Sequence, residues 1–427
     1  MVPVVLVFVV MQGFLLSLDL KQKGWEQIES VFPDRGVPRI NITLNDVSLD
    51  EVNEGSKDAK YEGNELTLYD GRSKREFDDV QVKGRGNTTW NQDKKPYQIK
   101  FAHKVDLLGM GKAKKWVLLA NSLDDTHLRN DIAMMLAEMV GVEYNHRGKF
   151  VEVYVDGEYI GLYYVLQKVE ISKGSVDLKR DDGLLFELDM VHRGDVKYYE
   201  THLGEYLVLK DSVVDLNEEE NSLIDEFIDD LNLAEKAVEK KDYEKLAKLM
   251  DVDSFAKYFL ISELTVNPDA YSTSFYMYRN NDGKIAAGPV WDFDLAFSNK
   301  EWVWNVDDRL FSPDEEMIKK REAFGYDGLE EDVNISKLLY YLMDMPEFRK
   351  KVAELFQETL MGRKEEIMEE IANKKDELEK IIRINNQKWK SKRDFDEEYR
   401  QLVEWLGARF DYFERTYGNG IKKKWLF

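Results

Sequence analysis

The spacing of apolar residues changes partway along the chain, and this change constrains the fold more than any other feature. From residue 37 to residue 170, apolar and polar residues mostly alternate in short runs such as NELTLYDG, separated by Asn, Asp and Gly. Alternation with a period of two is typical of strands that bury one face. From residue 213 onwards, apolar residues recur mainly at helical spacing among many Glu, Asp and Lys residues. We therefore predict an α+β fold with a β-rich N-terminal lobe over residues 37–170 and a mainly helical C-terminal lobe.

The β-rich part contains one helical pattern and one clear hairpin. DDTHLRNDIAMMLAEMVG has apolar residues on one helical face, with Asp124 or Asp125 to cap its start and Gly141 to end it. KFVEVYVDGEYIGLYYVLQKVE predicts two strands joined at Asp156-Gly157, which is a strong turn signal. The segment PRINITLNDVSLDEV is also strand-like.

The C-terminal lobe divides into a core and a helical region. Residues 171–334 combine the strand-like GLLFELDM, helical patterns broken near Asp251, and the strand-like FYMYR and KIAAGPVW. Residues 301–335 look irregular and insertion-like. Residues 335–427 are almost entirely helical in pattern, and their charge runs are typical of solvated helix faces with i,i+4 pairs.

Composition excludes several classes of function. The 83 acidic and 61 basic residues give a net charge of -22, which argues against a general nucleic-acid binder but does not exclude a nucleotide held by a few local cations or a metal. No cysteine is present, so disulfides, thiolate zinc sites and cysteine nucleophiles are excluded. The five histidines show no metal-ligand spacing.

The N-terminal segment MVPVVLVFVVMQGFLLSLDL is the only long apolar stretch. Its length is typical of a signal-peptide hydrophobic region or a short anchor, although a basic n-region and a clear cleavage site are missing. We predict a signal peptide or anchor over residues 1–20 and a secreted or membrane-anchored, extracytoplasmic protein. A buried strand or helix remains the alternative.

Two aspartates are placed where chemistry is expected. A predicted helix ends at Leu264, a loop presents Asp269, and a predicted hairpin then leads to GPVWDFDLAF with Asp292. A carboxylate pair at the mouth of a strand needs solvent or a cation. Protein kinases supply a catalytic-loop Asp, a hairpin and a metal-binding Asp-Phe in this order, after a Gly loop, a Lys-bearing strand, a helix and a hinge.

Six blocks carry a family resemblance in serial order from about residue 37 to residue 297. They are KGRGNTTW, KKPYQIKF, KWVLLAN, DDTHLRND, EVYVDGEYIGLYYVLQKVE and GPVWDFDLAF. With them, the chain resembles the CotH kinase family, atypical kinases typified by a bacterial spore-coat protein. The resemblance implies an atypical protein-kinase-like two-lobed fold that binds ATP and Mg²⁺ or Mn²⁺.

The resemblance also implies roles for residues of the C-terminal lobe. Asp269 matches the catalytic aspartate, which would accept the proton of a substrate hydroxyl or orient it. Asp292 matches the metal aspartate, and Asp294 is a candidate second ligand or a capping group. Ser274 stands where the kinase spacing H-R-D-x-x-x-x-N places a second metal ligand, so a serine hydroxyl replaces the usual Asn there; Asn267 is the alternative.

In the N-terminal lobe, Arg85, Asn87 and Thr88 would lie over the phosphates. The Gly-rich loop that carries them leaves backbone N–H groups open to an anion. Lys95 or Lys100 would neutralise the phosphates, and Lys95 is favoured because it lies closer to the loop.

Two further positions complete the predicted nucleotide site. Arg129, in LRND, would brace a phosphate or an acidic partner. Gln167 would lie in the hinge that faces adenine.

These observations lead to a function with open alternatives. We expect an atypical kinase that transfers the γ-phosphate of ATP to Ser or Thr hydroxyls of an extracytoplasmic protein. The loop lacks the third glycine of G-x-G-x-x-G and the chain has no H-R-D or V-A-I-K match. A catalytically inactive pseudokinase acting as a cell-surface interaction module therefore stays open, as does a nucleotidyl transferase or amino-acid ligase that uses the same cleft. The sequence does not determine the oligomeric state.

Overall fold

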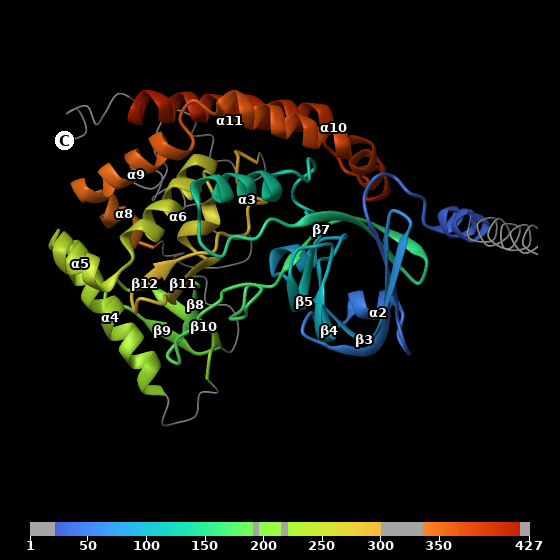
Figure 1. Ribbon diagram of the computed structural model, residues 1–427, viewed down its shortest axis with the longest axis horizontal. Helices are drawn as coiled ribbons and strands as arrows, with labels where there is room; N and C mark the ends of the chain where they lie inside the picture. Colours follow the sequence, from blue (N-terminus) through green and yellow to red (C-terminus); the bar gives the residue numbers. More distant parts are fainter. Residues whose placement is uncertain (1–21, 191–195, 215–220, 300–335, 419–427) are drawn as a thin grey trace, which may run out of the picture.

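The computed structural model describes residues 22–190, 196–214, 221–299 and 336–418 (Figure 1). The predicted signal peptide or anchor at residues 1–20 and the irregular segment expected at residues 301–335 lie outside this part of the chain. No helix in the described part is long and apolar enough to cross a membrane.

The alternating N-terminal segments form a closed barrel with the strand order β1-β2-β3-β4-β5-β7-β6. Its strands are β1 (Arg39–Thr43), β2 (Tyr61–Asp70), β3 (Ser73–Gly84), β4 (Tyr97–Asp106), β5 (Lys112–Leu119), β6 (Lys149–Val155) and β7 (Glu158–Gln167). Neighbouring strands are antiparallel except β1 and β6, which pair in parallel and close the barrel. Apolar side chains at alternate positions, among them Ile40, Ile99 and Val153, fill its interior.

The structure corrects one part of this pattern. PRINITLNDVSLDEV, predicted to be strand-like throughout, contains β1 followed by the short helix α2 (Leu49–Glu54). Ser48 and Glu51 form a capping box: the Ser48 hydroxyl accepts from the Glu51 N–H, and the Glu51 carboxylate accepts from the Ser48 N–H. This reciprocal cap fixes a helix start where alternation alone predicts a strand.

The predicted helix and hairpin of the N-terminal half are present. Helix α3 (Arg129–Val140) ends at Gly141, whose φ of 75° is the left-handed conformation that glycine adopts readily. The Asp124 carboxylate accepts from the Arg129 N–H at 3.0 Å and thus satisfies one of the first N–H groups of the helix. Strands β6 and β7 are joined at Asp156-Gly157, as predicted.

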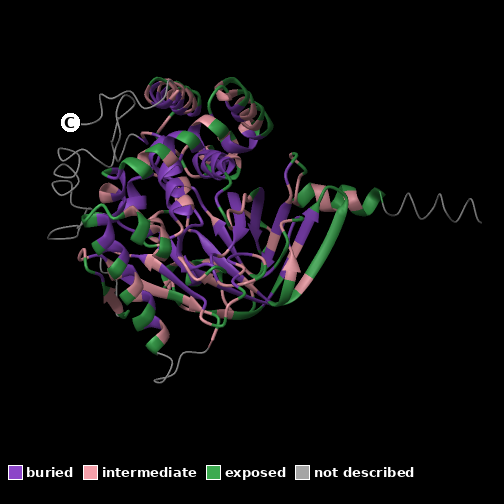
Figure 2. Ribbon diagram, turned by 60° about the vertical axis from the view of Figure 1, so that its left-hand side comes forward, coloured by how far each residue is buried: buried purple, intermediate pink, exposed green. Residues whose placement is uncertain are grey.

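A second sheet follows, with the strand order β12-β11-β8-β10-β9. Its strands are β8 (Leu184–Leu188), β9 (Tyr198–Glu200), β10 (Tyr206–Ser212), β11 (Phe275–Arg279) and β12 (Ile285–Ala287). In the described part of this half, the helices are α4 (Asn221–Glu239), α5 (Tyr243–Leu249), α6 (Val252–Thr265), α8 (Leu338–Met343), α9 (Pro346–Thr359), α10 (Lys364–Lys388) and α11 (Phe395–Tyr417). Helices and sheet enclose a shared buried core (Figure 2). The prediction of an α+β fold with a β-rich N-terminal part and a helical C-terminal part is confirmed.

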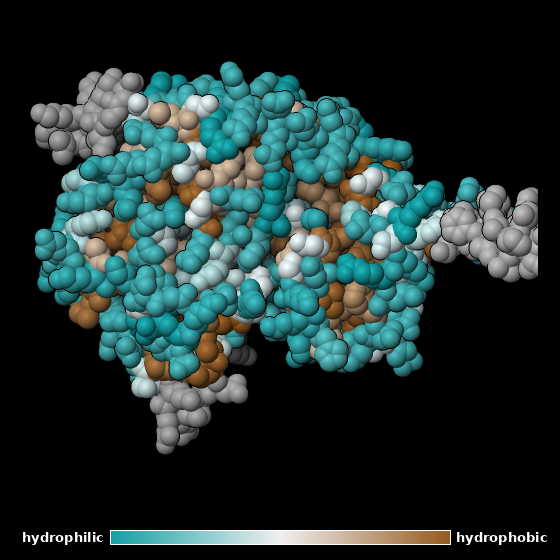
Figure 3. All heavy atoms as spheres, viewed as in Figure 1, coloured by the Kyte–Doolittle hydropathy of each residue, from teal (hydrophilic) through white to brown (hydrophobic). Residues whose placement is uncertain are grey.

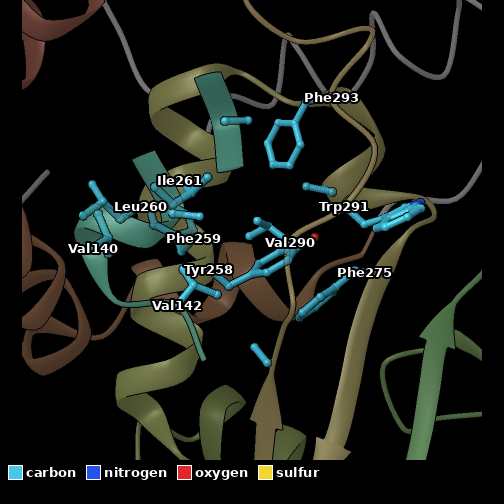
Figure 4. Close-up of a cluster of buried hydrophobic side chains, with 14 of the residues drawn as sticks. Val140, Val142, Tyr258, Phe259, Leu260, Ile261, Phe275, Val290, Trp291 and Phe293 are labelled. Carbon is cyan, nitrogen blue, oxygen red and sulfur yellow. The ribbon is translucent and has the colours of Figure 1, made fainter. Parts of the chain in front are cut away.

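The segment after β12 joins this core through its apolar residues. Val290, Trp291 and Phe293 are buried beside Tyr258 of α6 and Phe275 of β11 (Figure 4). The aspartates between and after them are thereby held at the edge of a packed core, where their positions follow the core rather than the solvent.

The C-terminal helices also reach back to the barrel (Figure 1). The Asn385 side chain of α10 accepts from the Leu162 N–H of β7 at 3.0 Å, and the Trp389 indole donates to the Ile160 carbonyl at 3.0 Å. The barrel and the helical half are therefore linked at this edge by direct hydrogen bonds.

Candidate functional site

A cavity of about 620 Å³ lies between the barrel and the second sheet. Figure 3 shows the surface hollowed between these two parts. The barrel side of the cavity is formed by the end of β3, the following loop, β4 and β5. The other side is formed by β8, β10, β11, the 3₁₀ turn η2 (Pro268–Tyr271) and residues 291–295. The predicted residues Asp269, Ser274, Asp292 and Asp294 lie together on the second side, which we call the acidic wall.

The loop that carries Asp269 begins where α6 ends. Val266 adopts a left-handed φ of 48° and stops the helix, and Asn267 then caps η2 by accepting from the Asp269 N–H at 3.2 Å. The Asn267 amide also donates to the Asp292 carbonyl at 3.1 Å. One side chain therefore connects the two loops that present Asp269 and Asp292.

The sequence pattern predicted that Asp292 lies at the end of a strand, but the structure does not place it there. Strand β12 stops at Ala287, and Asp292 lies in the irregular segment beyond it with a φ of 65°. A non-glycine residue in this conformation is uncommon and is often found at functional sites. Ser274, whose φ is 56°, donates its hydroxyl hydrogen to Asp292 Oδ2 at 3.4 Å.

Asp294 is the most perturbed carboxyl group of the acidic wall. Its side chain is buried, and burial together with the neighbouring Asp292 raises its pKa far above the ordinary value. The Asp294 carboxyl group therefore holds its proton more tightly than an ordinary carboxyl group. A divalent cation can replace that proton, since hard cations prefer carboxylate and hydroxyl oxygens.

The donor set suits a magnesium-like ion that is shared with a ligand. Among the described residues, no group of three or more His, Cys, Asp or Glu side chains is placed to hold a metal. Mg²⁺ in phosphoryl-transfer enzymes is usually held by one or two carboxylates plus water and phosphate oxygens. Asp292 and Asp294, with the Ser274 hydroxyl beside them, fit that pattern.

The barrel wall of the cavity carries Arg85, Asn87 and Thr88, as predicted. The Arg85 guanidinium lies over the Trp291 ring, 5.3 Å from its centroid, and so crosses the cleft towards the acidic wall. Burial lowers the pKa of Arg85, while Asp292 raises it. Gly86 has a φ of 80° and a Cβ there would lie 2.1 Å from Thr89 Oγ1, so the tight loop requires glycine.

Four predicted residues do not line this cavity. The Lys95 ammonium donates to the Trp90 carbonyl at 2.7 Å and lies over the Trp90 ring, and Lys100 is paired with Lys115 further along the barrel. Gln167 donates to the Met110 carbonyl at 2.6 Å. Arg129 is buried behind the acidic wall, where it binds the Asp124 carboxylate and donates to the Ala296 carbonyl at 3.2 Å.

Lysines other than Lys95 and Lys100 supply positive charge to the cavity. Lys83, Lys168 and Lys210 line the cavity, and Lys210 forms a 2.5 Å ion pair with Glu187 of β8. Burial, followed by the nearby Lys115 ammonium, lowers the pKa of Lys168. Several apolar residues line the same cavity and offer a surface to a flat base: Val117, Leu119, Leu123, Val169 and Val208.

Glu187 and the residues that hold the segment from Asp292 to Asp294 were not predicted from the sequence. Glu187 and Asp189 are polar residues two positions apart in the otherwise apolar GLLFELDM, and both line the cavity. This alternation was the signal available for them. Asn130, next to Arg129 in LRND, accepts from the Phe293 N–H at 2.9 Å, and only the folded chain brings these residues together.

Comparison with known proteins is consistent with this geometry. A family model described as CotH kinase protein matches residues 82–413, which include both walls of the cavity. The chain is also similar to the inner spore coat protein H of Bacillus subtilis (strain 168), with 22% identity over 297 residues, covering 66% of this chain and 72% of that protein.

Proposed function

Because the chain belongs to the CotH kinase family, we propose that it is an atypical kinase that transfers the γ-phosphate of ATP to a Ser or Thr hydroxyl of an extracytoplasmic protein. The observation that carries this proposal is the placement of Asp269, Asp292 and Arg85 around one cavity. Proton acceptance, metal binding and phosphate binding need these three kinds of group within a single cleft.

The acidic wall supplies the chemistry in this proposal. Asp269 accepts the proton of the substrate hydroxyl. The hydroxyl oxygen attacks the γ-phosphorus while the bond between this phosphorus and the β-phosphate oxygen breaks. Asp292 and Asp294 would hold Mg²⁺ or Mn²⁺, with the Ser274 hydroxyl as a further oxygen donor. The ion, when bound, neutralises charge on the β- and γ-phosphates.

The barrel wall binds the nucleotide. Arg85 offers a planar guanidinium to phosphate oxygens, and Gly86 lines the same cavity. Lys83, Lys168 and Lys210 add positive charge. The base packs between the apolar residues of the barrel and Val208 of β10, so that the barrel and the helical half act as the two lobes of a kinase-like fold.

Two observations bear on the location of the substrate. The relative in Bacillus subtilis is an inner spore coat protein, and the first 20 residues of this chain resemble an export signal or anchor. We propose that the protein and its substrate meet outside the cytoplasm.

Labelled ATP tests the reaction directly. The purified protein is incubated with γ-labelled or α-labelled ATP, Mg²⁺ or Mn²⁺, and a mixture of unfolded Ser/Thr-containing proteins, beside Asp269→Asn and Asp292→Ala. Incorporation of γ-label by the unsubstituted protein alone supports the kinase. Incorporation of α-label indicates nucleotidyl transfer or an adenylylated intermediate of amino-acid ligation. Absence of both labels, with no thermal stabilisation by ATP and metal, indicates a pseudokinase that serves as an interaction module.

A further inference from the structure

Three buried asparagines hold residues 292–294, the proposed metal motif; Asn130 and Asn267 lie far from it in the sequence, and Asn299 follows it by five residues. Asn267 donates to the Asp292 carbonyl at 3.1 Å, Asn130 accepts from the Phe293 N–H at 2.9 Å, and Asn299 donates to the Asp294 carbonyl at 2.7 Å. Each of these asparagines is 1% exposed. We call Asn130, Asn267 and Asn299 the asparagine cradle.

The cradle replaces hydrogen bonds that a strand would provide. Residues 288–294 follow β12 without regular secondary structure. The Gly288 N–H still donates to the Tyr276 carbonyl of β11 at 2.9 Å, whereas the Asp292 and Asp294 carbonyls and the Phe293 N–H bond to the cradle. Buried backbone groups without partners cost free energy. Side-chain amides can satisfy both N–H and carbonyl groups, because each carries donors and an acceptor. The conformation of the metal motif therefore depends on these side chains.

Asn130 has a second contact that sets it apart in the cradle. Its Nδ2 lies 3.5 Å from Asp294 Oδ1 and 3.3 Å from Asn121 Oδ1, to both of which it donates. It therefore holds the backbone of Phe293 and one carboxylate oxygen of Asp294 at the same time. Donation to one oxygen orients the carboxylate and leaves its other oxygen for a second partner.

We propose that Asn130 is a positioning residue that sets Asp294 as the second carboxylate ligand of the divalent ion in the cleft. This inference rests on the proposed function, because it concerns the metal of the same site. Asn130 lies in the first turn of α3, and its neighbour Arg129 donates to the Ala296 carbonyl at 3.2 Å. The start of α3 thus fixes the metal motif at two points, residues 293–294 and residue 296.

The experiment measures binding of Mn²⁺ to the full chain at a saturating concentration of a non-hydrolysable ATP analogue, from the electron paramagnetic resonance signal of free Mn²⁺. For Asn130→Ala we expect the apparent Kd for Mn²⁺ to rise about 10-fold or more, as for the loss of a hydrogen bond to a charged group. Binding of the analogue without metal should change less than about 2-fold, because the barrel wall is untouched. A general loosening of the fold would weaken the binding of both Mn²⁺ and the metal-free analogue, so it would not change one without the other.

Asn145→Ala is the matched control. The Asn145 amide, which follows α3, donates to the Met134 carbonyl of α3 at 2.9 Å, away from the cavity. Loss of this hydrogen bond therefore weakens α3 without altering the metal motif. We expect an unchanged Kd for Mn²⁺. Asn130→Ser, which keeps a small polar group, serves if the alanine variant does not fold, and the same rise in Kd is expected.

The outcomes separate the two proposals. If the unsubstituted protein binds Mn²⁺ with the analogue and a folded Asn130 variant binds it equally well, the positioning role is overturned and the proposed function stands. If the unsubstituted protein shows no metal-dependent binding, the proposed function itself is overturned.

Discussion

The two walls of the cavity are built in opposite ways. On the acidic wall, Asp269 and Asp294 are buried. The Asp269 N–H donates to Asn267, which caps the same turn, and the Asp294 carboxylate accepts from Asn130 of α3. On the barrel wall, Asn87 and Thr88 are exposed in the loop after β3. Groups that act on developing charge gain from being fixed in advance, whereas groups that close over a ligand need freedom to move. Under the proposed function, this difference is expected if the acidic wall carries the chemistry and the barrel wall closes over the ligand.

The largest expected effect comes from breaking the acidic wall at Asp269. Asp269→Asn removes the proton acceptor while keeping the shape of the side chain. We expect the rate of γ-phosphate transfer at saturating ATP to fall by about 10²–10⁴-fold, the usual contribution of a positioned general base. The KM for ATP should change little.

Asp189→Asn is the control for this prediction, because Asp189 also lines the cavity and accepts a hydrogen bond from the Tyr198 hydroxyl. A loss of rate equal to that of Asp269→Asn would show that negative charge in the cleft, rather than a base at Asp269, sets the rate.

On the barrel wall, Arg85→Ala should act on binding rather than on chemistry. Removal of the guanidinium should raise the KM for ATP by about 10–100-fold, since charge-assisted hydrogen bonds to phosphate are lost. The rate at saturating ATP should fall much less. Steady-state kinetics over a range of ATP concentrations measure both quantities. Lys114→Ala, an exposed cation of the same barrel, is the control; a fall in the saturated rate alone would contradict the assignment of Arg85 to the binding wall.

The acidic wall was largely predictable from the sequence, whereas much of the barrel wall was not. Asp269 and Asp292 flank a hairpin of short local connections, so their meeting follows from nearby residues. The side on which a lysine of β4 points depends on the register after Pro96, and Lys95 turns back to Trp90. Closure of the barrel by β1 and β6 joins residues more than 100 positions apart, which periodicity does not reveal.

The asparagine cradle illustrates the same limit. Asn130 and Asn267 lie far from the metal motif in the sequence, Asn299 follows it by five residues, and each satisfies a backbone group of the motif. An isolated asparagine in a sequence is more typical of a turn or a cap. Only the tertiary arrangement reveals a shared role.

The acidic wall is braced by a second carboxyl pair, which gives a smaller, pH-dependent effect. Glu205 accepts from the Ser336 hydroxyl at 2.8 Å, and the Ser336 N–H donates to the Tyr271 carbonyl of η2 at 2.7 Å. Burial, then the nearby charge of Glu205, raises the pKa of Glu235 from 4.5 to about 8. The Glu235 carboxylate also accepts from the Leu203 N–H in the β9–β10 turn.

The sign of the effect follows from proton binding. Between pH 4.5 and about 8 the folded state keeps a proton on Glu235 that the unfolded state has lost. The contribution of this group to stability is therefore fully present below pH 4.5 and is lost as the pH rises to about 8. Glu235→Gln keeps an acceptor for the Leu203 N–H and cannot ionise. We expect its melting temperature to fall less between pH 5 and pH 8 than that of the unsubstituted protein, measured by thermal unfolding. Glu226→Gln, an exposed position of α4, should follow the unsubstituted protein; parallel curves for all three proteins would refute the assignment.

The smallest expected effect separates nearness in sequence from nearness in space on the barrel wall. Lys95 adjoins the Gly loop in sequence but donates to the Trp90 carbonyl, whereas Lys168 is distant in sequence and lines the cavity. Lys95→Ala should change the Kd of the ATP analogue by less than about 3-fold and cost about 0–1 kcal/mol of stability, because the contacts that it loses with Trp90 and Gln92 are partly exposed. Lys168→Ala should weaken binding more, and isothermal titration of both variants measures the difference. A larger loss of affinity for the analogue in Lys95→Ala than in Lys168→Ala would contradict this assignment. It would mean that the loop turns Lys95 into the cleft, and that the barrel wall rearranges, when nucleotide binds.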